Sequence, residues 1–190
     1  MVDQNIIQIG AESRSANAFG ADYLSEIRRV IDAHAHGNSH TVLEWGMGNS
    51  TRFFLEERDA LHLAALYSID HHAEYFAALE KTLPKWDCFY AFRLDLIGQM
   101  ASDRDAGLNY STFPLSLPTR FDVIYIDGRR RMECALTAAQ LCGAHTIVFL
   151  HDYRRERYQG VRFLFDIVED GPQFRVMKLK PQLLAARPVK

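Results

Sequence analysis

Six polar side chains follow apolar runs of this sequence at the points where those runs end. They are Glu44, Asp70, Asp95, Asp127, His151 and Asp152. Carboxylates accept hydrogen bonds and attract cations, and a histidine exchanges protons near neutral pH. If the apolar runs are strands of one parallel sheet, these groups gather at its carboxyl edge, where ligands bind. The sequence therefore predicts one ligand site made from several strand ends.

The apolar runs alternate with segments of helical periodicity. Strands are expected over 41–45, 63–70, 87–96, 120–128 and 145–153, and helices near 23–31, 53–55, 71–83, 129–143 and 158–168. Ser15 or Asn17 would cap the first helix, and "FRVMKLK" and "LLAARPV" would form a closing hairpin around Pro181-Gln182. Residues 98–119 predict either a short helix or a cover over a site. We expect an α/β fold, with a doubly wound, mostly parallel sheet and helices on both faces.

The bulk properties fit a single globular domain. The 190 residues suffice for one domain, with 1–40 as an N-terminal helical extension and 41–190 as the cofactor-binding core. A net charge of −2 argues against nucleic acid as a partner. No apolar run approaches the roughly 20 residues that span a bilayer, and the first residues lack a signal-peptide pattern. A cytoplasmic protein without a membrane partner is expected.

The stretch "VLEWGMGNST", residues 42–51, predicts a strand, a glycine turn and a helix start. A dinucleotide needs a third glycine so that the loop can cradle a pyrophosphate, but that position is Thr51. The carboxylate of Glu44 would also repel a diphosphate. S-adenosylmethionine instead carries a sulfonium and an ammonium group, which a carboxylate attracts. Asp70 would suit the ribose hydroxyls of either cofactor.

The segments "LEWGMGNST", "YSIDHH" and "FDVIYIDG" resemble successive motifs of the class I S-adenosylmethionine-dependent methyltransferases. The resemblance runs from about Thr41 to the C-terminus. It implies a seven-stranded sheet in the order 3-2-1-4-5-7-6, with strand 7 antiparallel. By this resemblance, Glu44, Gly46 and Gly48 would line the methionine end, Asp70 would bind the ribose, and Asp95 would lie near the adenine. Three further residues are expected to bind the cofactor: Asn49, Ser50 and His71.

Two further segments, "IDGRRRMECAL" and "VFLHDYRRERYQGV", resemble more specifically a poorly characterised bacterial branch of this family. The segment 98–119 departs from the resemblance, because the family has a clear third crossover helix there.

Asp127, His151 and Asp152 form the predicted catalytic group, because they end two strands expected to be neighbours. Two mechanisms are open. His151 would act as a general base on the acceptor. Alternatively, Asp127 and Asp152 would hold a divalent metal such as Mg²⁺ that acidifies an acceptor hydroxyl. The metal mechanism resembles catechol-type and macrolide-sugar O-methyltransferases, although His151-Asp152 makes that match partial.

Two groups of arginines flank this catalytic group. Arg129, Arg130 and Arg131 are interpreted as a solvated first helical turn, and because they oppose the helix dipole they also admit an anionic substrate group. A second group, with two tyrosines beside it, would suit a carboxylate, a phosphate or a sugar, or would simply lie on the surface. It consists of Arg154, Arg155 and Arg157 with Tyr153 and Tyr158.

We therefore expect an S-adenosylmethionine-dependent methyltransferase that acts at oxygen on a small or medium-sized acceptor bearing an anionic group or a sugar. Whether it forms a homodimer stays open. Two rival functions are a non-catalytic S-adenosylmethionine-binding or interaction protein and a nicotinamide-dependent oxidoreductase. Thr51 and Glu44 disfavour the oxidoreductase.

Overall fold

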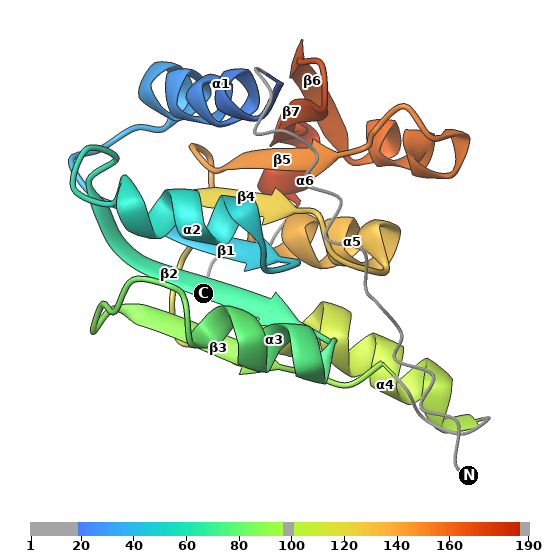
Figure 1. Cartoon of the computed structure of the whole chain (residues 1–190). Helices are drawn as coiled ribbons and strands as arrows, with labels where there is room; N and C mark the ends of the chain where they lie inside the picture. Colours follow the sequence, from blue (N-terminus) through green and yellow to red (C-terminus); the bar gives the residue numbers. More distant parts are fainter. Residues whose placement is uncertain (1–18, 97–100, 187–190) are drawn as a thin grey trace, which may run out of the picture.

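In the computed structural model, which describes residues 19–96 and 101–186, seven strands form one sheet (Figure 1). The strands are β1 His40–Trp45, β2 Leu63–Asp70, β3 Phe89–Arg93, β4 Val123–Ile126, β5 Ile147–His151, β6 Phe165–Asp170 and β7 Phe174–Leu179. Their order is β3-β2-β1-β4-β5-β7-β6. Neighbours pair in parallel, except that β7 is antiparallel to β5 and to β6. The predicted order and the antiparallel strand are confirmed.

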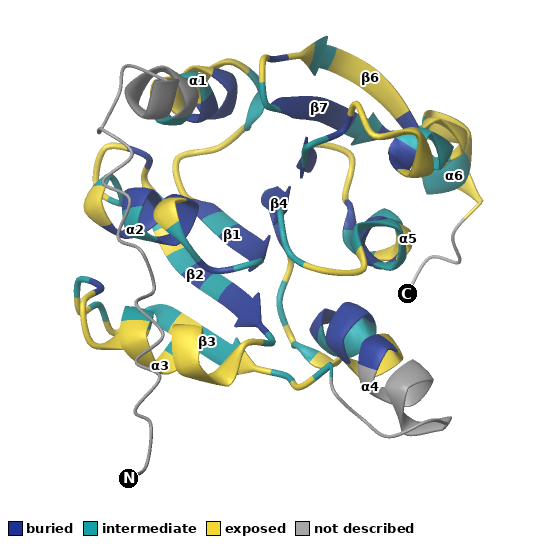
Figure 2. Ribbon diagram, turned by 45° about the vertical axis from the view of Figure 1, so that its right-hand side comes forward, coloured by how far each residue is buried: buried dark blue, intermediate teal, exposed yellow. Residues whose placement is uncertain are grey.

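Helices cover both faces of the sheet, as the sequence predicts (Figure 2). They are α1 Phe19–His34, α2 Asn49–Glu56, α3 Ala73–Glu80, α4 Ala101–Thr112, α5 Arg131–Leu141 and α6 Pro181–Ala185, with 3₁₀ helices η1 Phe113–Ser116 and η2 Glu156–Phe163. One core cluster joins Ile27 and Val30 of α1 and Phe54 of α2 to the sheet. The other joins Tyr110 of α4 and Cys134 of α5 to the opposite face. Central strands are therefore buried on both faces, which explains their nearly unbroken apolar sequences.

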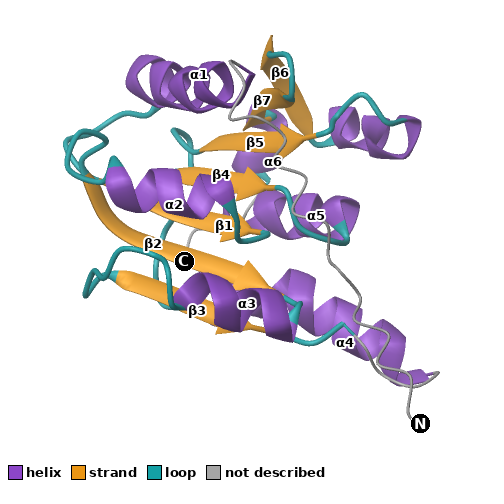
Figure 3. Ribbon diagram, viewed as in Figure 1, coloured by secondary structure: helices purple, strands orange, loops and turns teal. Residues whose placement is uncertain are grey.

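The strands β1, β2, β4 and β5 are parallel, so their carboxyl ends lie at one edge of the sheet. Figure 3 shows their arrowheads pointing the same way. β4 and β5 pair in register, with Ile126 opposite Leu150. Asp127 and His151 are the next residues along these two strands, so the pairing itself makes them neighbours. The predicted gathering of strand ends is confirmed for these four strands.

The helix predicted over 158–168 is correct only in its first half, where residues 156–163 form the 3₁₀ helix η2, and the hairpin predicted around Pro181-Gln182 is wrong. Residues 165–170 form β6, which pairs with β7 across a turn at Gly171, whose N–H donates to Phe174 O at 2.8 Å. Val168, which the helical spacing assigns to the same face as Val161 and Phe165, lies instead in β6 at the sheet edge and is 37% exposed. Pro181 begins α6 instead of a turn, because the first helical position needs no backbone N–H donor.

The segment 98–119 contains a crossover helix after all. α4 occupies residues 101–112, and η1 follows with Pro114 near its start. The resemblance is therefore closer here than the sequence indicates. Ser15 and Asn17, the predicted caps of α1, lie outside the described residues.

Candidate functional site

The loop between β1 and α2 is packed against the loop that follows β4. Gly46 has a φ of +96°, and a Cβ at this position would lie 2.6 Å from the backbone nitrogen of Gly128. A Cβ on Gly128 would lie 2.1 Å from the hydroxyl oxygen of Tyr110 on α4. Side chains at these two glycines would displace backbone, so the glycines are what permits the contact. The loop predicted to hold the cofactor and the loop that carries Asp127 are thus in backbone contact.

The N–H groups of residues 46–48 all donate to acceptors within the protein. They donate in turn to Ile69 O at 2.8 Å, Asp70 Oδ2 at 3.0 Å and Thr51 Oγ1 at 2.8 Å. A pyrophosphate-binding loop presents such groups to its ligand. In this glycine loop the three N–H groups instead form hydrogen bonds with β2 and with the start of α2, so they are not available to a ligand.

Asp70 fastens the glycine loop to the end of β2. Besides the bond from Met47 N–H, its Oδ1 accepts from the backbone N–H groups of His71 at 2.7 Å and His72 at 2.8 Å. The residue is 5% exposed. Its carboxylate is therefore fixed next to the loop, and its predicted bonds to a ribose stay a prediction.

Glu44 is completely buried beneath the same loop. Its carboxylate accepts hydrogen bonds from Ser50 Oγ, from Thr51 Oγ1 at 2.6 Å and from Ser68 Oγ at 2.7 Å. Burial raises the pKa of Glu44 to about 7, against the opposing effect of these three bonds. In the structure Glu44 ties β1, α2 and β2 together. Its predicted contact with a cationic ligand group is not tested by this arrangement.

The other predicted cofactor residues differ in their positions. Asn49 is exposed at the first position of α2, and the His71 ring is half-buried 6.0 Å from the Tyr110 ring. Burial lowers the pKa of His71, although Asp70 opposes this effect. Asp95 lies two residues beyond β3, is exposed, and pairs with Arg93 at 2.8 Å. Among the described residues, Asp95 forms no hydrogen bond or ion pair with the glycine loop, and its role near an adenine stays a prediction.

Sequence analysis overlooked Tyr75, on the first turn of α3. Its hydroxyl would be 3.4 Å from a Cβ at Gly48, so it lies over the glycine loop. Burial raises its pKa, and the negative charges of Asp70, Glu44 and Asp127 raise it further. The only sequence signal was its place four residues after His71 on a helix that starts at the site.

The three predicted catalytic residues lie together. His151 Nδ1 is 3.2 Å from Asp127 Oδ1 and 3.6 Å from Asp152 Oδ1, and Nε2 is 3.3 Å from Gln173 Oε1. Burial lowers the pKa of His151, but the hydrogen bonds and charges of Asp127, Gln173 and Asp152 outweigh it, so the net shift is upward. The imidazole is thus oriented on one side by a carboxylate and on the other by an amide.

Arg131, interpreted from the sequence as part of a solvated turn, is instead mostly buried, with its side chain 11% exposed. It donates to the carbonyl oxygens of Gly128, Asp127 and His151, at 3.1, 3.0 and 2.7 Å. It also pairs with Asp127 Oδ1 at 2.7 Å and with Asp152 Oδ2 at 3.2 Å. Arg131 therefore holds together the loops that follow β4 and β5.

The donors predicted for a divalent metal do not fit one. Asp127 and Asp152 both face the guanidinium of Arg131, and Arg155 pairs with Asp152 Oδ2 at 2.7 Å. A cation of the protein thus stands between the two carboxylates where a metal would bind. Across residues 19–96 and 101–186, no group of three His, Cys, Asp or Glu side chains is arranged for a metal.

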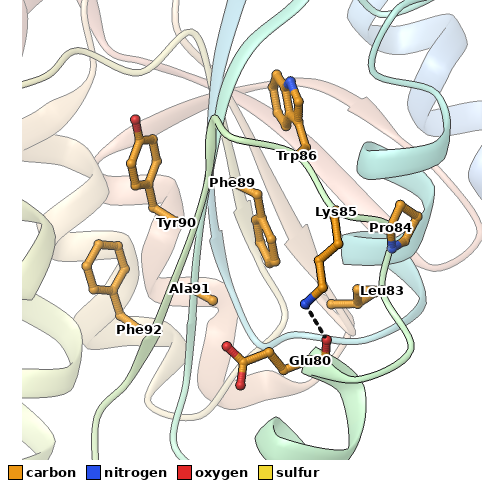
Figure 4. A pocket seen from close by; sticks show the side chains of 9 residues that line it. All are labelled: Glu80, Leu83, Pro84, Lys85, Trp86, Phe89, Tyr90, Ala91 and Phe92. Atoms are coloured by element: carbon orange, nitrogen blue, oxygen red, sulfur yellow. Dashed lines mark hydrogen bonds between the residues drawn. The ribbon is translucent and has the colours of Figure 1, made fainter.

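A cavity of about 400 Å³ lies beside β3 (Figure 4). Its lining comes from the last turn of α3, the connection to β3 and β3 itself, with Trp86, Phe89 and Tyr90 among the aromatic side chains. Lys85 Nζ donates to Glu80 O at 3.3 Å across one side of it. This cavity contains none of the predicted site residues.

Comparisons with known proteins bear on the fold. The sequence matches no family model and no curated protein. The structure is similar to that of the N-methyltransferase NodS from Bradyrhizobium japonicum WM9, with a TM-score of 0.57 and 14% identity over 86% of this chain and 98% of NodS. It is also similar to TrmN from Thermus thermophilus, with a TM-score of 0.52 and 17% identity over 83% of this chain and 48% of TrmN.

A third similar structure is Sp1610 from Streptococcus pneumoniae, which was determined in complex with S-adenosyl-L-methionine. The TM-score is 0.50, with 13% identity over 83% of this chain and 72% of Sp1610. This chain thus spans nearly all of NodS but about half of TrmN. Together with the strand order, these likenesses show that the chain has the class I methyltransferase fold. Separately, none of the helices among the described residues is long and apolar enough to cross a membrane.

Proposed function

We propose that this protein is an S-adenosylmethionine-dependent methyltransferase that methylates an oxygen atom of a small or medium-sized acceptor. The observation that carries the proposal is the contact between the glycine loop and the loop bearing Asp127, since it would bring a cofactor bound at the first loop next to an acid–base pair at the second. In this proposal Asp70 serves the cofactor, and His151 with Asp127 serves the acceptor.

The hydrogen bonds of the glycine loop support S-adenosylmethionine over a dinucleotide. The three N–H groups of residues 46–48 are engaged by the protein, so they are not free to bind a pyrophosphate. Thr51, at the position of the third glycine, is one of the acceptors. A cofactor without phosphates requires no such donors, which also counts against the nicotinamide alternative.

When bound, S-adenosylmethionine supplies a methyl group on a sulfonium, which an acceptor oxygen can attack in a direct displacement. The protein would align the acceptor and remove its proton. Asp127 Oδ1 lies 3.2 Å from Nδ1 of His151, so its negative charge would stabilise the imidazolium that forms when Nε2 takes the proton of an acceptor hydroxyl. Gln173 Oε1 lies 3.3 Å from Nε2, so the Gln173 side chain would have to turn away for that hydroxyl to reach this nitrogen.

An exchange of one carboxylate tests the cofactor side. Asp70→Asn should weaken S-adenosylmethionine binding by about 1.5–3 kcal/mol, the range for hydrogen bonds that involve a charged group. Asp87→Asn is the matched control, because Asp87 is exposed at the amino end of β3. Equal affinities in the wild-type protein and a folded Asp70→Asn variant would refute the cofactor side of the proposal.

The acceptor atom is tested separately. The wild-type protein is incubated with S-adenosylmethionine carrying a ¹³C-labelled methyl group and a panel of hydroxylated sugars, catechols and hydroxy acids. The carbon shift of the product then distinguishes methyl on oxygen from methyl on nitrogen or carbon. Product labelled only on nitrogen or carbon would refute O-methylation, and cofactor binding without turnover on any acceptor would favour a non-catalytic binding protein.

A further inference from the structure

A second cavity, of about 270 Å³, adjoins the proposed acceptor side and is lined by arginines. Its arginines come from two separate segments: the loop and first turn of α5, and the start of η2. They are Arg129, Arg130, Arg131, Arg155 and Arg157. Glu133 is the one carboxylate in the lining. Such a concentration of guanidinium groups around one hollow is suited to an anion.

The arginines of this cavity differ in whether a carboxylate of the protein already pairs with them. Arg131 and Arg155 pair with Asp152, and Arg130 pairs with Glu133 at 3.4 Å. Arg129 and Arg157, by contrast, form no ion pair within the part of the chain that the structure describes. The structure therefore leaves two uncompensated positive charges at the cavity.

Arg157 is also held in place. Its guanidinium lies 4.9 Å from the ring centroid of Tyr158, which is itself buried and lines the cavity. Arg131 approaches the same ring, at 5.6 Å. Stacking on an aromatic ring restricts a guanidinium and so reduces the entropy that is lost when it binds a ligand.

The start of α5 adds to the positive potential. Arg130 occupies the N-cap position with a φ of 52°, and its side chain does not cap the backbone N–H groups of the first turn. Met132 and Glu133 of this turn line the cavity. The positive end of a helix dipole favours an anion, and Glu133 opposes it in part.

The cavity shares Arg131 with the His151–Asp127 pair. Arg131 lines the cavity and contacts the carbonyl oxygen of His151 at 2.7 Å. An anionic group in the cavity would therefore belong to the molecule whose hydroxyl approaches His151. We propose that this cavity binds the phosphate group of a phosphorylated small-molecule acceptor, with Arg129 and Arg157 as its principal ligands. The inference that the cavity is the acceptor site rests on the proposed methyltransferase function. The inference that the cavity binds an anion does not depend on that function.

A phosphate fits these features better than a carboxylate does. A phosphate monoester carries up to two negative charges near neutral pH, which matches the two uncompensated guanidinium groups. Its tetrahedral oxygens can accept from donors in several directions, as a cavity lined from two segments requires.

The test is a titration of the wild-type protein with inorganic phosphate at constant ionic strength. Binding is monitored by chemical-shift changes in two-dimensional ¹H–¹⁵N NMR spectra. Arg129→Gln and Arg157→Gln should each weaken phosphate binding by about fivefold or more, which is the loss of about 1 kcal/mol expected for a partly exposed ion pair. Arg154→Gln is the matched control, since Arg154 is an exposed neighbour that does not line the cavity. Its affinity should stay within about twofold of wild type.

Three results would overturn the proposal. One is phosphate binding that is equal in the wild type and both variants, or absent at millimolar concentration. Another is acetate binding as tightly as phosphate, which would indicate a carboxylate ligand. The third is tight binding of a short RNA hairpin without binding of phosphate.

A parallel titration with S-adenosylmethionine separates this inference from the proposed function. If the cofactor binds but phosphate does not, the anion site is wrong and the methyltransferase proposal stands. If phosphate binding depends on Arg129 and Arg157 but the cofactor does not bind, the anion site stands and the methyltransferase proposal fails.

Discussion

His151 and Asp127 lie side by side at the carboxyl ends of β5 and β4, with Nδ1 of the histidine 3.2 Å from Oδ1 of the aspartate. The relationship follows from strand register, because Leu150 and Ile126, the residues just before them, are paired. It orients the imidazole and favours its protonated form. Because the pKa of His151 is raised above its ordinary value of 6.5, the neutral base would accumulate only at higher pH.

Replacing His151 should slow turnover strongly while leaving cofactor binding nearly unchanged. We expect His151→Asn to lower the rate by about 10²–10⁴-fold, the usual effect of losing a positioned acid–base group. Affinity for S-adenosylmethionine should change by less than about 1 kcal/mol, measured by calorimetry. His62→Asn is the matched control, because His62 is exposed and its φ of 51° suits asparagine.

Asp127→Asn should shift the pH dependence of the rate in a defined direction. The wild-type rate should rise with pH through one ionisation above pH 6.5, because the neutral imidazole is the base. Loss of the Asp127 charge lowers the pKa of His151, so the midpoint should move to lower pH. A midpoint that stays in place, or a cofactor affinity reduced as severely as by Asp70→Asn, would contradict this assignment.

Arg131→Lys should destabilise the protein. Lysine cannot reproduce the fork that binds the carbonyl oxygens of Asp127, Gly128 and His151 together with two carboxylates. We expect the free energy of unfolding to fall by about 1–3 kcal/mol, measured by urea denaturation. Arg129→Lys, an exposed neighbour, should change it by less than about 0.5 kcal/mol. Similar values for the two variants would show that Arg131 does not hold the loops.

Glu44 should make the protein less stable as the pH rises. The pKa of its carboxyl is about 7 in the folded protein, against an ordinary value of 4.5 that applies to the unfolded chain. Between pH 4.5 and pH 7 the folded state therefore binds more protons than the unfolded state. Proton linkage then makes the free energy of unfolding fall with pH, because the folded state must ionise a buried carboxyl. We expect Glu44 to contribute a loss of about 2–3 kcal/mol between pH 5 and pH 8.

The measurement is urea denaturation of the wild type and Glu44→Gln across this pH range. Glutamine does not ionise, so the difference between the two curves isolates residue 44, and the variant should gain in relative stability as pH rises. Glu80→Gln, at the exposed end of α3, serves as the control and should follow the wild-type curve. A Glu44→Gln curve parallel to wild type would mean that Glu44 is already ionised at pH 5.

The sequence predicts the central fold because local and global signals agree there. Strands buried on both faces are continuously apolar, and each ends in a polar residue such as Asp70 or Asp127, so the parallel direction of these strands could be inferred from the pattern, whereas the strand order came from the family resemblance. β6 was missed because it lies at the sheet edge, where Ile167 and Val168 need not alternate with polar residues. α4 was obscured because the segment 98–119 is polar and contains Pro114 and Pro118, so it shows no clear apolar helical face.

The site was less predictable where it depends on contacts between distant segments. The role of Arg131 is set by carbonyl oxygens on two loops that meet only through the pairing of β4 with β5. Tyr75 reaches Gly48 only because Asp70 and the cap at His72 aim α3 across the loop. Single-sequence patterns carry no information about either arrangement.

Calorimetric titration of the wild-type protein with S-adenosylmethionine, S-adenosylhomocysteine and NAD tests the central claim most directly. Because the N–H groups of residues 46–48 are engaged within the protein, we expect NAD not to bind. The proposed function predicts that both adenosyl ligands bind with dissociation constants in the micromolar range, about −8 kcal/mol. Both adenosyl ligands should also raise the melting temperature, because they bind only the folded state. Binding of NAD, with neither adenosyl ligand bound at millimolar concentration, would contradict the assignment.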